Sequence, residues 1–346
     1  MDQNALMQTP PADMRHLPWR MSVAPMMAWT DRHCRHFHRL LTQRTRLYTE
    51  MISTDALIHG ASQQERLRLD EAEHPVALQL GGNDPADLAH CARLGARAGF
   101  DEINLNCGCP SERVQRGALG ACLMAEPARV ADCVRAMVDV VDVPVTVKHR
   151  IGIDRIESYA FVRDFVGTVA EAGCRIFIVH ARNAWLQGLS PRQNRTVPPL
   201  RHALVYRLKR DFPQLGIVIN GGIASDAQVQ EHLAHVDGVM VGRAAYHDPW
   251  WLSGWDTRFW GAAPGPRPLT RADVQAQMVA HMAREHARTG SEWPAMARHM
   301  LGLYKGEPGA RLWRRIWSDH GLKMLPVADV AAQASAALRV PEPAVA

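Results

Sequence analysis

The chain has 346 residues, of which 47% are hydrophobic and 22% charged, and its formal net charge at pH 7 is +5. This composition is typical of a globular protein with a large core and excludes a mainly disordered chain. The positive charge permits a polyanionic partner but does not require one. The length fits one (β/α) barrel of about 250 residues with a small additional domain.

The sequence shows neither the pattern of a secretion signal nor that of a membrane helix. Residues 1–11 lack the basic start and apolar stretch of a secretion signal. No apolar run approaches the roughly 20 residues that a membrane helix needs. We therefore expect a cytoplasmic protein without membrane contact, whose seven cysteines stay reduced.

Short apolar runs rich in β-branched residues alternate with longer stretches of helical spacing, which predicts βαβ units and a parallel sheet. The strands are expected at 21–24, 47–50, 76–80, 102–105, 143–148, 176–179, 217–219 and 238–241. Eight such units favour an α/β fold of the TIM (β/α)8 barrel type. A doubly wound open sheet is the alternative, but the first strand runs into Ala24-Pro25-Met26-Met27 without a dinucleotide fingerprint.

The last quarter of the chain lacks strand patterns. Glycines and prolines after residue 262 indicate a linker. From Thr270, which can cap a helix, the residues Val274, Met278 and Met282 recur on one helical face. With the later amphipathic stretches they predict a small C-terminal helical bundle of about four helices. The expected segments are an N-terminal extension (1–18), the barrel (19–262), a linker (263–269), the helical domain (270–338) and a tail (339–346).

Polar residues stand where the predicted strands end, which is where TIM barrels place their active sites. In chain order they are Gln79, Asn106, Cys109, Lys148, His180, Asn220, Gly221, Gly222, Gly242 and Arg243. Glycines after the seventh and eighth strands allow backbone N–H groups to approach a phosphate, and Arg243 would add a charged hydrogen bond. Either glycine site alone is more typical of an ordinary turn, but glycines after both strands together favour a phosphate site.

Lys148 ends an apolar predicted strand and would point into the barrel mouth, where its ammonium needs an anion. The negatively charged pyrimidine edge of a reduced flavin is one such anion. A salt bridge to Glu50 or Asp101 is the alternative. His180 could bind flavin or phosphate in the same way, or could be purely structural.

Cys109 lies in a Gly-Cys-Pro turn at the predicted barrel mouth. An ordinary thiol pKa of about 8.5 suits a proton donor near neutral pH. A passive turn cysteine and a metal pair with Cys107 are the alternatives. A single Cys-X-Cys without a second pair is weak support for zinc, so we expect no metal.

Several motifs carry a resemblance to one enzyme family. They are Ser22-Val23-Ala24-Pro25-Met26, Tyr48-Thr49-Glu50-Met51, residues 74–82, residues 101–106 running into Gly108-Cys109-Pro110-Ser111, Val145-Thr146-Val147-Lys148, and Ile219-Asn220-Gly221-Gly222-Ile223. Two further stretches, 180–191 and 309–315, differ between branches of this family. On these motifs the sequence closely resembles the tRNA-dihydrouridine synthases, specifically the A-type that acts on U20 and U20a.

The resemblance implies FMN as cofactor, NADPH as reductant and the D-loop of tRNA as substrate. We also expect the protein to be a monomer. It implies that hydride goes to C6 of a uridine while Cys109 protonates C5. The implied flavin contacts are Pro25, Met26, Met27, Gln79, Lys148, His180, Asn220, Gly221, Gly222, Gly242 and Arg243. The implied tRNA contacts are Asn106, Arg182, Ser190, Arg311 and Arg314.

Helical spacing is compatible with the RNA contacts of the tail. Arg311 and Arg314 share one helix face, and Trp313 and Trp317 share another, so one face can bind phosphate while the other packs. A solvated basic face is the alternative reading.

Two positions depart from the family pattern. Cys107 stands where valine is more usual, and His149 where a small polar residue often follows the lysine. Cys107 would place a second thiol near the flavin, which suggests oxidative coupling to a neighbouring cysteine. Two rival functions stay open: a flavoenzyme that reduces a free pyrimidine, and a barrel that binds RNA without catalysis.

Overall fold

The computed structural model describes residues 18–263, 265 and 267–338. The extension expected at 1–18, except residue 18, the tail expected at 339–346, and positions 264 and 266 of the expected linker lie outside these residues. The chain forms two compact units. Of the described residues, one unit contains residues 18–27 together with Arg44–Gly242, and the other contains Ala28–Gln43 together with those from Arg243 to residue 338.

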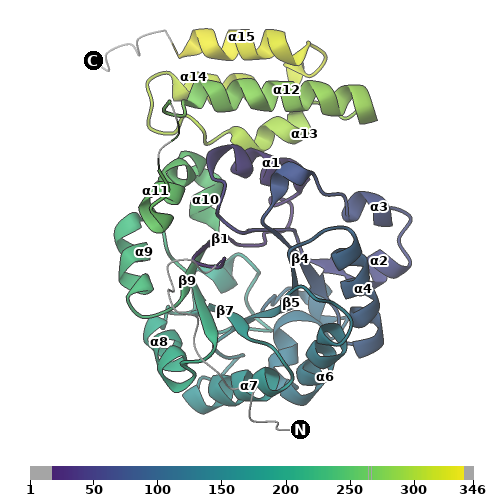
Figure 1. Ribbon diagram of the computed structural model, residues 1–346. Helices are drawn as coiled ribbons and strands as arrows, with labels where there is room; N and C mark the ends of the chain where they lie inside the picture. The colour runs from purple at the N-terminus through teal and green to yellow at the C-terminus, as the bar shows by residue number, and fades with distance from the viewer. Residues whose placement is uncertain (1–17, 264, 266, 339–346) are drawn as a thin grey trace. The chain divides into compact units, whose positions relative to one another are not determined.

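The first unit is a parallel barrel (Figure 1). Its strands are β1 (Met21–Val23), β2 (Leu47–Tyr48), β3 (Ile52–Ser53), β4 (Val76–Gly81), β5 (Glu102–Cys107), β6 (Val145–Arg150), β7 (Ile176–His180), β8 (Gly216–Asn220) and β9 (Gly238–Val241). The hydrogen-bonded order is β1-β9-β8-β7-β6-β5-β4-β2, and β3 pairs with β4. A parallel bridge from Ser22 to Arg46, next to β2, joins the two ends of this order. The expected TIM barrel is confirmed, and only the two-residue β3 was not predicted.

Helices follow the strands of this unit. They are α2 (Thr54–Ile58), α3 (Gln63–Arg66), α4 (Pro85–Arg97), α5 (Glu112–Gln115), α6 (Pro127–Val138), α7 (Tyr159–Glu171), α8 (His202–Asp211) and α9 (Asp226–Leu233), with 3-10 turns η3 (Glu71–Glu73), η4 (Gly120–Ala125) and η5 (Gln193–Arg195). Gly95 shows how closely α4 packs on the sheet, since a Cβ there would lie 2.5 Å from Leu78 Cδ2 and 2.8 Å from Ile103 Cδ1. Leu78 and Ile103 therefore face the helices, and the alternation along β4 and β5 turns Gln79 and Asn104 inward.

At the amino ends of the strands, the barrel interior contains a buried carboxylate. Glu102 is fully buried and accepts hydrogen bonds from Trp19 Nε1 (2.7 Å) and Tyr48 Oη (2.8 Å). Thr146 Oγ1 also donates to it, and Arg46 Nη1 lies 3.2 Å from its carboxylate. The charge of Glu102 is thus balanced inside the barrel.

Two strands extend two residues further at their carboxyl ends than predicted. β5 continues to Cys107 and β6 continues to Arg150, so Lys148 is two residues from the end of its strand rather than at its end. The apolar pattern could not show this, because the added residues are polar and their hydrogen bonds to neighbouring strands are long-range contacts.

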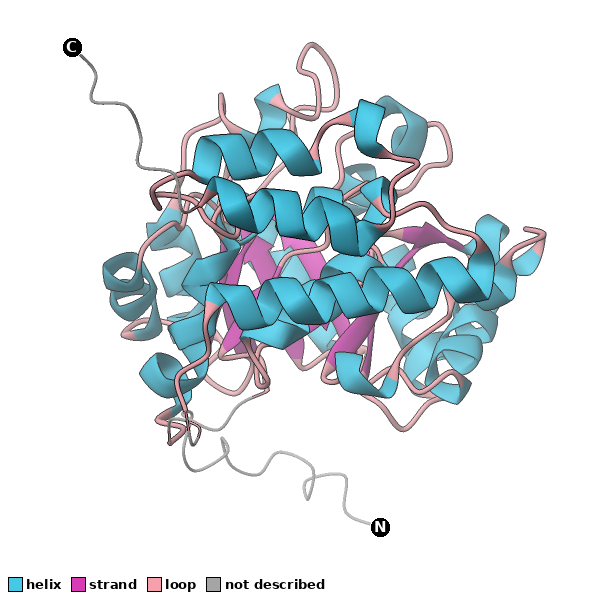
Figure 2. Cartoon of the chain, turned by 90° about the horizontal axis from the view of Figure 1, so that it is seen from above, coloured by secondary structure: helices cyan, strands magenta, loops and turns pink. Residues whose placement is uncertain are grey.

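The described part of the second unit is helical, as the colouring in Figure 2 shows. It contains α1 (Arg32–Leu41), α10 (Arg243–His247), η6 (Pro249–Gly254), α11 (Trp255–Trp260), α12 (Arg271–Thr289), α13 (Pro294–Ala297), η7 (Arg298–Met300), α14 (Ala310–Trp317), η8 (His320–Leu322) and α15 (Val327–Ala337). The C-terminal helical bundle is therefore confirmed. Thr270 caps α12 in a reciprocal capping box with Asp273.

The apolar faces of this unit lie as expected. Val274, Met278 and Met282 are fully buried on α12. On α14, Trp313 and Trp317 are buried, and Trp313 Nε1 donates to Gln275 Oε1 at 2.6 Å.

An early segment of the chain is part of this unit. The Asp31 carboxylate caps α1 and also pairs with Arg298 (2.6 Å) and His299 (3.0 Å). Arg32, on the same helix, pairs with Glu285 of α12. These ion pairs attach α1 to helices that lie more than 240 residues later in the chain, as the 253-residue separation of Arg32 and Glu285 illustrates. Among the described helices, none is long and apolar enough to cross a membrane.

Candidate active site

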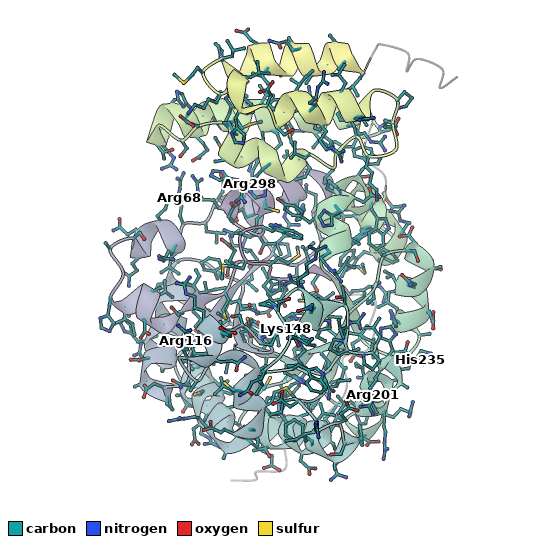
Figure 3. The ribbon with its side chains drawn as sticks, turned by 180° about the vertical axis from the view of Figure 1, so that it is seen from behind. Arg68, Arg116, Lys148, Arg201, His235 and Arg298 are labelled. Carbon is teal, nitrogen blue, oxygen red and sulfur yellow. The ribbon has the colours of Figure 1, made fainter. Side chains whose placement is uncertain are left out.

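Lys148 lies inside the barrel, towards the carboxyl ends of the strands. In Figure 3 it lies near the middle of the first unit, whereas Arg201 and His235 lie at its edge. Its Nζ donates to Asn220 Oδ1 at 3.2 Å, and Asn220 Nδ2 donates to the Met240 carbonyl. Burial, and secondarily the charge of Arg150, lower the pKa of Lys148 to about 7.

One of the proposed salt-bridge partners of Lys148 lies elsewhere. Asp101 precedes β5 at the amino end, where its carboxylate binds His74 Nδ1 (2.8 Å) and the amide of Val76 (2.6 Å). A salt bridge from Lys148 to Asp101 is therefore wrong. The ammonium instead rests on a neutral amide oxygen, so an anion near it would be stabilised.

Cys109 lies in a turn directly after β5, and Asn106 holds this turn. Asn106 Oδ1 accepts hydrogen bonds from the backbone amides of Gly108 (3.0 Å) and Cys109 (2.9 Å). Cys109 is half-buried, and its Sγ lies 3.5 Å from Ser111 Oγ. The turn thus fixes the backbone while the thiol stays partly accessible, as a proton donor to a ligand requires.

A ladder of amides links this turn to the amino end of the barrel. Asn106 Nδ2 donates to Gln79 Oε1 (2.9 Å), and Gln79 Nε2 donates to Asn104 Oδ1 (2.7 Å). Asn104 Nδ2 donates to Thr146 Oγ1 (2.7 Å), which in turn donates to Glu102. Because every member of the ladder is a donor and an acceptor, the orientation of Asn106 is specified from the opposite end of the barrel.

The side chain of Cys107 faces away from the barrel interior. Asn106 faces the barrel interior, so the next residue on β5 faces the outer helices. Cys107 is fully buried there, and burial raises the pKa of its thiol, with smaller contributions from the thiols of Cys133, Cys174 and Cys122. The hypothesis that Cys107 places a second thiol near the flavin is therefore wrong.

His149 is outward-facing for the same reason. Its ring packs near Phe165 and Phe177, and burial lowers its pKa to about 4. It is a packing residue on the helix-facing side of β6. Among the described residues, no group of three or more His, Cys, Asp or Glu side chains is arranged to hold a metal ion.

Glycines after β8 provide backbone that a side chain would obstruct. Gly221 and Gly222 have φ values of +123° and +76°. A Cβ on Gly221 would lie 2.9 Å from the His180 ring, and one on Gly222 would lie 2.5 Å from Leu200. These two positions therefore require glycine. His202 Nε2 contacts the Gly221 carbonyl at 3.0 Å and helps to fix it.

The remaining predicted flavin contacts lie next to the two points at which the chain passes from the barrel unit to the second unit, after Met27 and after Gly242. Pro25 and Met26 are half-buried, whereas Met27 is 64% exposed. Gly242 faces Met26, since a Cβ there would be 3.7 Å from Met26 Sδ. Arg243 is exposed and begins α10, which belongs to the second unit.

The predicted RNA contacts differ in exposure. Arg182 is half-buried and donates to the Pro198 carbonyl, and Ser190 is exposed and exchanges hydrogen bonds with Gln193. In the second unit Arg311 and Arg314 are both exposed on α14.

Arg150 is a site residue that the sequence analysis missed. It is 3% exposed, and its guanidinium donates to the carbonyls of Gly108 (3.1 Å), Asn183 (3.1 Å) and Asn194 (3.0 Å). It therefore joins the Cys109 turn to the loop after β7. The period of two from Lys148 places Arg150 on the same strand face, and this was the signal that could have revealed it.

Two comparisons with known protein sequences agree. The family model described as dihydrouridine synthase matches residues 22–337. A protein of Salmonella typhimurium named tRNA-dihydrouridine(20/20a) synthase is 56% identical over 309 residues, which cover 88% of this chain and 91% of that protein. Proteins of the same name from Pseudomonas aeruginosa (56% over 300 residues; 86% and 89% covered) and Escherichia coli (54% over 312 residues; 89% and 88% covered) are similarly close.

Solved structures support the barrel fold. A mutant of morphinone reductase in complex with tetrahydroNAD matches with a TM-score of 0.50 and 13% identity, covering 70% of this chain and 87% of that one. An old yellow enzyme homologue from Zymomonas mobilis matches with a TM-score of 0.50 and 12% identity, covering 68% and 88%. At this identity the likeness concerns the fold alone.

Proposed function

The chain belongs to the dihydrouridine synthase family of flavin-dependent oxidoreductases, and from this premise we propose that it uses FMN and NADPH to reduce uridines U20 and U20a in the D-loop of tRNA. The reduction removes the C5–C6 double bond and produces dihydrouridine. The observation that carries the proposal is the thiol of Cys109, on a turn fixed by Asn106, at the same barrel end as the half-buried amine of Lys148.

The residues at this barrel end fit a flavin mononucleotide. Lys148 lacks a carboxylate among its hydrogen-bond partners in the described chain, which suits the anionic pyrimidine edge of a reduced flavin. Gly221 and Gly222, both in left-handed backbone, suit the close approach of a phosphate. We assign the remaining contacts to Pro25, Met26, Met27, Gln79, His180, Asn220, Gly242 and Arg243.

These positions assign each group a step in the reaction. Bound flavin supplies a hydride, obtained from NADPH, to C6 of the uridine. Cys109 donates the proton that C5 needs, and its thiolate is then reprotonated from solvent through the exposed side of the turn. Asn106 keeps the turn in place through its two backbone contacts. The target base has to leave its stack to reach this position.

RNA contacts in both units complete the proposal. Asn106, Arg182 and Ser190 would approach the target nucleotide and its neighbours from the barrel. Arg311 and Arg314 would bind phosphates, because they are exposed on α14 while its tryptophans are buried. Action on tRNA by a monomer is compatible with the cytoplasmic location expected from the sequence.

One experiment separates the proposal from its rivals. The flavin-loaded protein is incubated with NADPH and unmodified tRNA, and dihydrouridine is mapped along the product. We expect it at positions 20 and 20a. Reduction of free uracil or orotate but not of tRNA would support a free-pyrimidine reductase, and tRNA binding without any dihydrouridine would support a non-catalytic RNA-binding protein.

A further inference from the structure

The backbone carbonyls of Gly108, Cys109 and Pro110, which form the Cys109 turn, each accept a hydrogen bond. The carbonyl of Gly108 accepts from Arg150, and that of Pro110 accepts from Gln115 Nε2 at 2.7 Å. The carbonyl of Cys109 itself accepts from the amide of Ala121 at 2.9 Å. The turn is therefore held by three different elements.

Ala121 can hold the turn only because of its neighbour. Gly120 has φ +74°, and a Cβ at that position would lie 2.4 Å from the Cys109 carbonyl oxygen. This contact joins the turn to η4, which follows it closely in the chain. It does not join the turn to the loop after β7.

Gln115 makes a connection to another loop. Its Nε2 donates to the Pro110 carbonyl and, at 2.8 Å, to the carbonyl of Leu186. Leu186 belongs to residues 182–195 after β7, which we call the β7 loop and which carries the proposed RNA contacts Arg182 and Ser190. One side-chain amide thus uses both of its protons to join the Cys109 turn to the β7 loop.

The β7 loop is itself a rigid partner. Asn194 is fully buried, and its side chain exchanges two hydrogen bonds with the backbone of Trp185 (2.7 and 2.9 Å). Asp154, held in the left-handed region at φ +46°, accepts from the Leu186 amide at 2.8 Å. Leu186 is therefore hydrogen-bonded through its amide to Asp154 and through its carbonyl to Gln115. The position of the β7 loop thus determines the position of the Gln115 side chain.

We propose that Gln115 is a positioning residue that fixes the Cys109 thiol relative to the β7 loop, so that RNA seated on this loop is presented to the thiol in register for protonation at C5. The inference rests on the proposed function. It requires that Gln115 affect the step in which tRNA is reduced, and leave the reduction of the flavin by NADPH unaffected.

The test separates these two steps in the full flavin-loaded protein. Gln115→Met keeps the length of the side chain but removes both donors. Gln63→Met is the matched control, because Gln63 Nε2 also donates to a backbone carbonyl, that of Leu57 at 2.7 Å, in the α2–α3 region. Bleaching by NADPH and single-turnover reoxidation by saturating unmodified tRNA are followed by stopped-flow absorbance.

We expect Gln115→Met to slow reoxidation by roughly 10- to 100-fold at saturating tRNA, as a misplaced reacting group does. Bleaching by NADPH and the affinity for tRNA should stay within about twofold of wild type, as both should in the Gln63→Met control. Reoxidation as fast as in the control would overturn the proposal. An equal loss in both half-reactions would also overturn it, because it would indicate general damage.

A second variant tests the role of Gln115 through the pH dependence of reoxidation. Gln115→Glu is isosteric and places a carboxylate against two carbonyls, so it should slow reoxidation at pH 8. The two carbonyl oxygens disfavour the charged form and raise the pKa of the new carboxyl above the usual value of about 4.3, so the rate relative to wild type should rise as pH falls to 5, where the protonated carboxyl regains one donor. A pH-independent ratio would count against the proposal, and this variant also decides the case if Gln115→Met fails to hold flavin.

The proposed function can fail separately. If the wild-type protein, once bleached by NADPH, is not reoxidised by tRNA, the proposed function is refuted, and the role of Gln115 with it. If wild type is reoxidised and the Gln115 variants behave as the control, only the positioning role is refuted.

Discussion

The two ends of the barrel interior both bury charge, but they do so in opposite ways. At the amino end the carboxylate of Glu102 has Arg46 at 3.2 Å and three neutral donors around it. At the carboxyl end Lys148 and Arg150 donate to neutral oxygens within the described chain. A buried charge with its counter-charge is a structural element, whereas cations that rest on neutral groups leave room for an anionic ligand. By this difference the carboxyl end, rather than the amino end, is the candidate for binding an anionic ligand.

The largest effect should come from the reacting group at the carboxyl end. Cys109→Ala should leave bleaching by NADPH intact and reduce dihydrouridine formation by about 10²- to 10⁴-fold, the usual contribution of a general acid. Cys122→Ala is the control, because Cys122 is also only half-buried but donates to the Leu119 carbonyl at 3.0 Å. Near-normal turnover of Cys109→Ala would mean that another acid serves C5.

At the amino end the expected effect is on stability. Glu102→Gln leaves the buried guanidinium of Arg46 without its counter-charge and should lower the free energy of unfolding by about 3 kcal/mol or more. Urea denaturation measures it. Glu65→Gln, which removes an exposed partner of Arg68 at 3.9 Å, should change stability by less than about 1 kcal/mol. Equal effects of the two substitutions would contradict the structural role of the amino end.

The pKa of Lys148 provides the next test. Burial lowers this pKa to about 7, whereas the unfolded value is near 10.5. Between these values the unfolded chain binds more protons, so the flavin-free protein should gain stability as pH rises from 7 to 10. A bound anion favours the charged ammonium and should raise the pKa again, so binding of the reduced flavin should take up a proton and weaken about tenfold between pH 7.5 and 9.

Two substitutions test whether Lys148 takes up the proton. The number of protons taken up on binding of the reduced flavin is measured by calorimetry in buffers of different ionisation enthalpy. Lys148→Met should abolish the proton uptake. Lys209→Met should preserve it, because Lys209 is paired with Asp237 at 2.9 Å. Proton uptake that persists in Lys148→Met would assign the titration to another group.

The smallest effect should come from the exposed arginines of α14, through their contribution to tRNA binding. Arg311→Ala with Arg314→Ala should weaken tRNA binding and lower the salt dependence of binding by between one and two units of slope. The control is Arg129→Ala with Arg135→Ala, which removes the same charge from exposed positions on α6. An unchanged slope in the α14 variant would exclude this face as a docking surface.

The sequence predicts features that depend on local pattern. Eight strands, the buried face of α12 and the opposed faces of α14 follow from periodicity, and strand-end positions such as Lys148 and Asn220 follow from the fold type. Gln115 was missed because one of its partners, the Leu186 carbonyl, lies 71 residues away, which no local pattern encodes. The spacing of two from Lys148 could have placed Arg150 on the inner face of its strand, but not its partner, the Asn194 carbonyl 44 residues away. Cys107 was placed wrongly for a related reason: the extra length of β5, set by its pairing with β6, decides which way that thiol faces.

The composition of the second unit has a consequence for dissecting the protein. Its helices include α1, which is made first and is tied through Asp31 and Arg32 to Arg298, His299 and Glu285. On the ribosome, α1 has to wait for more than 250 further residues before its partners are synthesised, as the separations of Asp31 from Arg298 and His299 show. A fragment that starts at residue 243 lacks this helix, so transplanting the RNA-binding part onto another barrel requires residues 28–43 to travel with it.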